Sequence, residues 1–219
     1  EVDDCLAATG ARPIAWLARE GLLDARWQLV HATHSERGEI EAVARSGAGV
    51  VICPSTEGTL GVGRADLPGW LEAGGPRSIG SDSHVTRQWR EELRWLDYGQ
   101  RLALRQRNVS AAPASGGPST AQRLFSLALQ GGGTAAGQAR WGLQPGARAD
   151  ALVVDMQDSS LLGVPQANLL DALVFSSPGR PWRDVIVAGR WVVRDHRHPQ
   201  AAAIARRFEA AMGEIWAEA

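Results

Sequence analysis

Side chains that can bind metals or transfer protons lie where short apolar segments end. The clearest group is Gly-Ser-Asp-Ser-His at residues 80–84, which closes the segment 77–81. A carboxylate at that place can bind a borderline cation such as Zn²⁺, and it can also accept a proton from water. The same pattern equally suits Asp82 as the cap of a turn or of a following helix. These five residues alone leave both interpretations open.

A histidine, His31, ends another apolar segment, 27–31. By itself, a histidine there is more often a core residue with satisfied hydrogen bonds, and His34 nearby is expected in a loop. A polar run, 55–57, follows a third apolar segment, 49–54. In β/α barrels the catalytic groups sit at the carboxyl ends of the strands, where loops converge on one centre. The pattern therefore favours one shared site.

Two other groups contain residue types found in metal or nucleophile sites, but their surroundings in the sequence do not predict such a site. His-Arg-His at 196–198 has the spacing of a metal-binding pair, but only a proline and one helix follow it, so we expect an exposed turn. Cys53 ends an apolar strand and is expected to be a small buried residue rather than a thiolate. Cys5 lies far from it in sequence, and nothing indicates a cross-linked scaffold.

The first part of the chain alternates strands and helices. Continuous apolar runs such as 49–54 are typical of parallel strands covered on both faces. Three such strands cannot close a barrel, so the chain represents part of one. The expected strands are 27–31, 49–54 and 77–81, and the expected helices are 3–20, 36–45 (capped by Ser35 and stopped by Gly47), 89–105 and 120–130 (stopped by Gly131–Gly133).

The second part has a different pattern, which begins near Leu143. Residues 146–155 predict a turn and a strand, and 184–194 predict a β-hairpin that turns at Ala188–Gly189. An amphipathic helix is expected over 200–219. We therefore predict two domains, 1–139 and 140–219.

Bulk composition excludes several classes of function. The 219 residues are 44% hydrophobic and 21% charged with a net charge of −1, so no attraction to nucleic acid or anionic membranes is expected. All 23 basic residues are arginine, which excludes a lysine Schiff base. No segment approaches the roughly 20 apolar residues of a membrane helix. The start has neither a signal-peptide pattern nor a methionine, so we expect a cytoplasmic protein that is incomplete at its front.

Taken together, these segments resemble the amidohydrolase superfamily, and within it the formimidoylglutamate deiminase branch of histidine degradation. The resemblance covers nearly the whole chain. The last two of its motifs in tandem are quite specific to this branch. The motifs are residues 1–7, 29–34, 53–57, Gly-Ser-Asp-Ser-His-Val at 80–85 and Glu-Glu-Leu-Arg-Trp-Leu-Asp-Tyr-Gly-Gln-Arg-Leu at 91–102.

The resemblance implies an α/β fold: the C-terminal part of a (β/α)8 barrel, about strands 6–8, plus part of a small β-sandwich domain and a C-terminal helix. His31 matches the histidine after the sixth strand, which is expected to hydrogen-bond the substrate or the attacking water. Asp82 matches the aspartate after the eighth strand, a zinc ligand and proton carrier. The family's His-x-His pair, its fifth-strand histidine and its acid/base glutamate would precede Glu1, and we assign no substrate-binding residue.

The implied reaction converts N-formimidoyl-L-glutamate and water into N-formyl-L-glutamate and ammonia, with zinc as cofactor and a homodimer as the full-length state. Because most ligands are missing, this chain alone is expected to bind zinc poorly, to be inactive and to leave a sheet edge open. Two alternatives remain at this point. One is another amidohydrolase that acts on a purine or a triazine, and the other is a non-catalytic fragment or interaction module.

Overall fold

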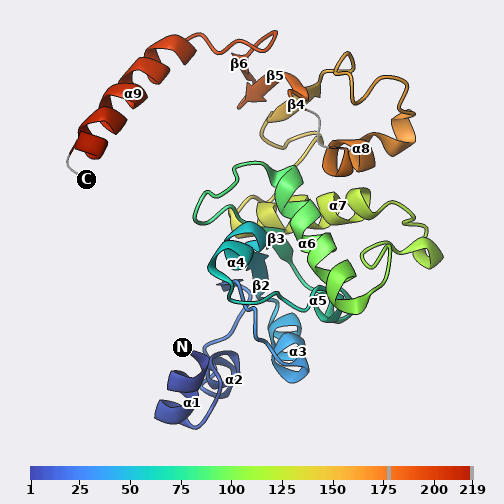
Figure 1. Cartoon of the computed structure of the whole chain (residues 1–219). Coiled ribbons are helices and arrows are strands. Elements are labelled where there is room, and N and C mark those ends of the chain that lie inside the picture. Colours follow the sequence, from blue (N-terminus) through green and yellow to red (C-terminus); the bar gives the residue numbers. More distant parts are fainter. Residues whose placement is uncertain (177–178, 218–219) are drawn as a thin grey trace. The chain divides into compact units, whose positions relative to one another are not determined.

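A three-stranded parallel sheet forms the centre of the first part of the chain. The computed structural model describes residues 1–176 and 179–217 (Figure 1). Strands β1 (Gln28–Val30), β2 (Gly49–Ile52) and β3 (Arg77–Ile79) pair in the order β1-β2-β3. The strand predicted over 27–31 exists, but the prediction that it is buried is wrong. Val30 is 53% exposed, and β1 is an edge strand that pairs only with β2 among the described strands.

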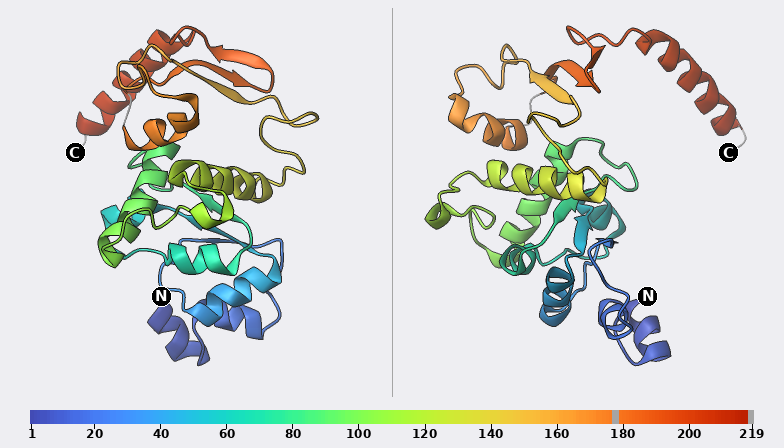
Figure 2. Two further views of the ribbon diagram at one scale, coloured as in Figure 1. Left: turned by 90° about the vertical axis from the view of Figure 1, so that its right-hand side faces the viewer. Right: turned by 180° about the vertical axis from the view of Figure 1, so that it is seen from behind.

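Helices connect and cover these strands. Trp70, Ile40 and Leu93 are among the largest fully buried side chains of the core. Helix α3 packs beside α5, and α7 packs on β3 (Figure 2). Neither α4 nor α5 was expected; each has a proline in its first two positions, where proline suits a helix start. The helices of this part are α3 (Arg37–Ser46), α4 (Pro54–Leu60), α5 (Leu67–Ala73), α6 (Trp89–Leu104), α7 (Thr120–Ala135) and α8 (Leu169–Phe175), with 3₁₀ turns at Pro113–Ser115 and Gln166–Asn168.

The N-terminal region contains two helices where one was predicted over 3–20. Helix α1 (Val2–Thr9) ends because Gly10 takes a left-handed conformation, φ 71°. Helix α2 begins with Pro13 and runs to Arg19. The start of α3 also differs from expectation, because Glu36 rather than Ser35 caps it, in a reciprocal capping box with Glu39.

Helix α7 passes through the three glycines that were expected to stop it. A Cβ atom on Gly131 would lie 2.0 Å from the Arg77 carbonyl oxygen. A Cβ atom on Gly133 would lie 2.7 Å from the Cβ of Trp141. The glycines therefore allow α7 to approach β3 and its own following segment closely, and this packing outweighs their poor helix propensity.

The second part contains an antiparallel sheet. Strands β4 (Ala151–Val154), β5 (Trp182–Val187) and β6 (Arg190–Val193) pair in that order. The predicted hairpin turn at Ala188–Gly189 is confirmed, with φ of 49° and 77°, as a type I′ turn requires. Helix α9 (Ala201–Ala217) follows, and residues 218–219 of the predicted helix lie outside the described residues.

The chain divides into two compact units. The first comprises Glu1–Trp141 together with the segment from Val164 that contains α8. The second comprises Gly142–Gly163 and the segment with β5, β6 and α9. The domain boundary at 139/140 and the β-sandwich stay predictions. Across the part of the chain that the structure describes, we find no helix that is long and apolar enough to cross a membrane.

Candidate active site

The two predicted site residues follow the two edge strands of the parallel sheet, and both have a left-handed backbone. His31 comes directly after β1 with φ 67°, and Asp82 comes three residues after β3 with φ 39°. Such a conformation costs roughly 1–3 kcal/mol for a residue other than glycine, and it persists only when the surroundings enforce it. The His31 N–H donates to the Val51 carbonyl at 2.8 Å. The Ser83 N–H, beside Asp82, donates to Thr56 Oγ1 at 3.1 Å.

These strand ends bring His31 and Asp82 together. His31 Nε2 lies 3.5 Å from Asp82 Oδ2. Cys53, which follows the central strand, places its sulfur in the same cluster, and one ligand atom from each of the three residues lies within 4.8 Å of the others. The expectation that the polar strand ends share one edge is thus confirmed for their positions. Their chemical roles stay predictions.

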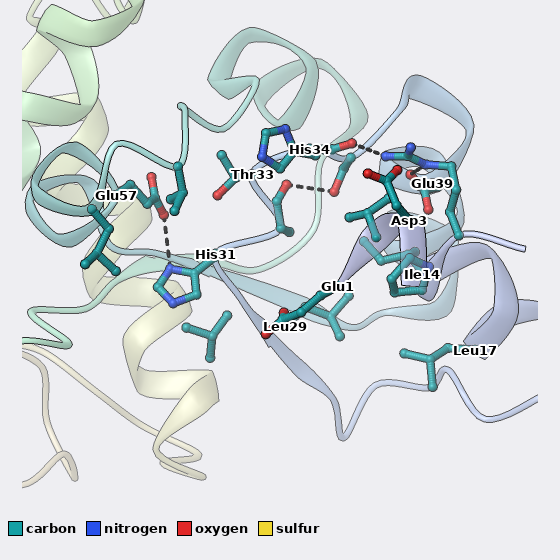
Figure 3. A pocket seen from close by; sticks show the side chains of 18 of the residues that line it. Glu1, Asp3, Ile14, Leu17, Leu29, His31, Thr33, His34, Glu39 and Glu57 are labelled. Carbon is teal, nitrogen blue, oxygen red and sulfur yellow. Dashed lines mark hydrogen bonds and ion pairs between the residues drawn. The ribbon is translucent and has the colours of Figure 1, made fainter. Parts of the chain in front are cut away.

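Glu57 is part of this cluster. It lies on α4 and is only 3% exposed, and its Oε1 accepts the Cys53 N–H at 3.0 Å. The same oxygen lies 3.4 Å from Nδ1 of His31, whose ring points toward it in Figure 3. Burial raises the pKa of the Glu57 carboxyl above its usual range. In the sequence, Glu57 is distinguished only as part of the polar run 55–57, and its position after a buried strand is the one signal that could have identified it.

A second buried carboxylate fixes the start of α4. Glu92, on α6, is 2% exposed. It accepts the Ser55 N–H at 3.0 Å and the Ser55 hydroxyl at 2.5 Å. Since Ser55 is in the first turn of α4, this contact sets where Glu57 points from the next positions of the same helix.

Cys53 is a protonated thiol in this environment. Burial, followed by the negative charges of Asp82, Glu57 and Glu92, raises its pKa to about 11. A thiol with that pKa is a poor nucleophile at neutral pH. The prediction that Cys53 is a small buried residue is confirmed by its exposure of 2%.

A cavity of about 710 Å³ opens beside His31, within the first unit. Its volume is in the range of small-molecule sites. Figure 3 shows apolar side chains of α2 and β1, such as Leu17 and Leu29, on one side and Thr33 and Glu57 on the other. The one arginine among its lining residues, Arg12, forms an ion pair with Glu39 at 3.0 Å. That guanidinium is therefore already engaged by a carboxylate of the chain.

The His-Arg-His group at 196–198 behaves only partly as expected. His198 is exposed, but His196 is partly buried, and its Nε2 lies 2.9 Å from Asp155 Oδ2. The expectation of an exposed turn is therefore wrong for His196. The reason is tertiary: the His196 N–H donates to the Arg183 carbonyl at 2.8 Å, which folds the turn back onto β5.

Comparison with known proteins gives this arrangement its context. The profile of the Amidohydrolase family matches residues 1–192. The chain belongs to the amidohydrolase family. It is 46% identical over 215 residues to the formimidoylglutamate deiminase of Pseudomonas aeruginosa, an alignment that covers 98% of this chain and 47% of that protein. This amidohydrolase chain thus spans about half the length of the curated relatives it matches.

Two solved structures have the same fold as this chain. A crystal structure of an amidohydrolase from Brucella melitensis matches with a TM-score of 0.90 and 39% identity, over 99% of this chain and 47% of that one. An adenosine deaminase from Xanthomonas campestris with bound zinc matches with a TM-score of 0.80 and 24% identity, over 98% and 48%. The predicted α/β amidohydrolase fold is confirmed, while the numbering of the strands as 6–8 stays a prediction.

Proposed function

We propose that this amidohydrolase chain supplies part of the active site of a hydrolase that converts N-formimidoyl-L-glutamate to N-formyl-L-glutamate and ammonia. One observation carries the proposal. His31, which lines the cavity, and Asp82 follow different strands and converge to 3.5 Å in a chain that is 46% identical to a formimidoylglutamate deiminase. A small polar substrate fits a cavity of this kind, whose lining combines apolar walls with a few polar groups.

The donor set fits a zinc ion. A carboxylate oxygen and an imidazole nitrogen are common zinc ligands, and Asp82 keeps 39% of its side chain exposed, so a cation can reach it. We assign Asp82 as the ligand that this chain contributes. Zinc, when bound, acts as a Lewis acid and makes water a stronger nucleophile at neutral pH. The zinc-bound structure from X. campestris is compatible with this assignment through its fold.

In the proposed reaction, Asp82 accepts a proton and His31 orients the water or the substrate. The Asp82 carboxylate accepts a proton from the attacking water at an oxygen, since a carboxylate within hydrogen-bond reach can act as a general base. His31 holds the water or the substrate's formimidoyl nitrogen through Nε2, which faces Asp82. The strained backbone at both residues keeps the side chains in place before the substrate arrives.

The proposal is tested by ammonia release. We would express the complete reading frame that encodes this segment and assay it with N-formimidoyl-L-glutamate and, separately, with adenosine. We expect ammonia from the first substrate only and a loss of at least 100-fold in Asp82→Asn. Asp155→Asn is the matched control, since it removes a carboxylate beside His196 and should keep full activity. Ammonia from adenosine alone, or an active Asp82→Asn protein, would overturn the assignment.

A further inference from the structure

Glu57 is a buried carboxylate to which the proposed reaction assigns no step. Its side chain is 3% exposed. A buried charge is costly unless hydrogen bonds or an opposite charge compensate it. Two groups face its Oε1 atom: the Cys53 N–H at 3.0 Å and the His31 Nδ1 atom at 3.4 Å.

The position of Oε1 is set independently of His31. The Cys53 N–H that it accepts belongs to the backbone directly after β2. Glu57 also lies in α4, whose first turn is held by the hydrogen bonds between Ser55 and Glu92. Oε1 is therefore anchored to the sheet and to α6, and the His31 ring must adapt to it.

This anchor determines which ring nitrogen of His31 carries the proton. A neutral imidazole has one N–H donor and one acceptor nitrogen. If Nδ1 were the acceptor, its lone pair would face a carboxylate oxygen, and the two would repel each other. Asp82 poses the same repulsion to an Nε2 lone pair at 3.5 Å, but its side chain is 39% exposed and solvent screens its charge, whereas the Glu57 side chain is 3% exposed. Donation from Nδ1 to the buried Glu57 therefore removes the stronger repulsion and leaves the lone pair on Nε2. The 3.4 Å distance is a long hydrogen bond, and such bonds in ligand-free sites commonly shorten when substrate binds.

The tautomer of His31 determines which kind of group can bind between Nε2 and Asp82. In this tautomer, the Nε2 lone pair and the Asp82 carboxylate are both acceptors, and they lie 3.5 Å apart. Two acceptors that face each other favour a group with N–H or O–H donors that can approach both. A formimidoyl nitrogen or a water molecule is a group of this kind.

We propose that Glu57 is a positioning residue that fixes the His31 ring in its Nδ1–H tautomer, so that Nε2 accepts a hydrogen bond from the donor that binds beside Asp82. The role assigned to that donor rests on the proposed function. The tautomer itself does not, because it follows from the contacts of Glu57 and from its deeper burial relative to Asp82. Histidines that bind a metal through one ring nitrogen are oriented in the same way by a carboxylate that accepts the N–H of the other ring nitrogen. Loss of such a carboxylate typically lowers metal affinity or activity by about 10–100-fold.

The chain offers a matched control in Glu92. It is as deeply buried as Glu57, at 2% exposed, and it also accepts a backbone N–H. Its hydrogen bonds go to Ser55, so its contribution is to the packing of α4 on α6. A change that merely disturbs a buried carboxylate should have similar effects at both positions, whereas a change in the His31 tautomer is specific to Glu57.

The test uses the full chain, metal-free and ¹⁵N-labelled, at about pH 8.5, some two units above the ordinary imidazole pKa. Two-bond ¹H–¹⁵N spectra distinguish the protonated ring nitrogen from the bare one, and His31→Gln identifies the His31 signals. We expect Nδ1–H in the wild type and in Glu57→Gln, whose amide oxygen can still accept. In Glu57→Leu we expect the proton to move to Nε2, while Glu92→Gln should leave the tautomer unchanged.

Two results of this experiment would overturn the proposed tautomer. A wild-type spectrum with Nε2–H, or with both nitrogens protonated, overturns the proposal even if Glu57→Leu fails to fold. A folded Glu57→Leu protein that keeps Nδ1–H overturns it as well. Because this experiment needs neither zinc nor turnover, failure of the ammonia assay would count against the proposed function and leave the tautomer result standing.

Discussion

Two histidines in this chain look alike at short range. His31 and His196 both have a left-handed backbone, with φ of 67° and 59°. Each also has a ring nitrogen close to a carboxylate oxygen: 3.4 Å from His31 Nδ1 to Glu57, and 2.9 Å from His196 Nε2 to Asp155. Judged by distance alone, His196 has the better pair.

Their surroundings differ between the proposed site at His31 and the turn at His196. His196 lies in a two-residue turn with Asp195, between the bridged residues Arg194 and Arg197, and such turns require left-handed residues. His31 instead ends a parallel strand, and its second ring nitrogen faces another carboxylate, Asp82, which follows a different strand. The proposed site therefore rests on the convergence of several strand ends and not on a single histidine–acid pair.

The largest expected effect comes from disrupting the packing of α7 on β3, the strand that precedes Asp82. Gly131→Ala would place a Cβ atom 2.0 Å from the Arg77 carbonyl oxygen and force α7 away from β3. We expect a loss of about 3 kcal/mol in the free energy of unfolding, measured by urea denaturation.

Its neighbour in the same helix is the control. An added Cβ on Gly132 meets no described atom within 4 Å. Gly132→Ala should therefore stabilise the protein by about 0.5–1 kcal/mol through helix propensity. Equal losses for the two variants would contradict the close packing of α7 on β3. The imidazole signals of His196 should be the same in both.

A second prediction probes the negative field at the His31 site. In the metal-free protein, a Cys53 pKa of about 11 in place of 9.0 lowers the thiolate fraction at pH 8 roughly 100-fold. We expect a thiol reagent to label Cys5 first and Cys53 at least 100-fold more slowly, with Cys5→Ser to assign the rates. Asp82→Asn should accelerate Cys53 labelling, whereas Asp155→Asn should not. Equal rates for the two thiols would contradict this environment.

A third prediction compares the two carboxylates as metal ligands. Asp82→Asn should weaken zinc binding at least about tenfold, because it removes a charged ligand. Asp155→Asn should leave the affinity unchanged, since Asp155 is engaged by His196 in the second unit. Competition with a chromogenic chelator measures both. Equal losses would remove the distinction between the two histidines.

The smallest effect on stability is expected from Asp184, whose carboxylate accepts a hydrogen bond from the turn that contains His196. The Asp195 N–H and the Arg183 side chain, each at 2.8 Å, lower the pKa of the Asp184 carboxyl. A lowered folded-state pKa stabilises the protein above the unfolded value of 3.8, and this contribution disappears as the pH falls through the folded-state pKa.

Asp184→Asn should therefore be less stable than the wild type at pH 7, and the difference should shrink toward pH 3. Thermal unfolding across that pH range measures the effect. Asp195→Asn, which changes an exposed side chain and keeps the backbone donor, should follow the wild-type curve. A constant difference at all pH values would show that the Asp184 carboxylate charge is not responsible.

Local patterns predicted most elements but not all of their ends. The apolar run 49–54 and the turn at Ala188–Gly189 were identified correctly, because burial and turn geometry constrain those residues directly. Glycine was the main source of error. Gly10 ends a helix that was predicted to continue, and Gly131 lies inside one that was predicted to end. The difference is whether another part of the chain packs against the glycine.

The candidate site shows the same division. The sequence alone predicts that His31 and Asp82 come at strand ends, and a parallel β/α order is enough to put such residues at one edge of a sheet. The position of Glu57 beside them depends on tertiary packing. Its direction depends on α4, whose first turn is held by Glu92 from 37 residues along the chain. Contacts between residues so far apart leave no periodic pattern in the sequence, because they depend on how the elements pack.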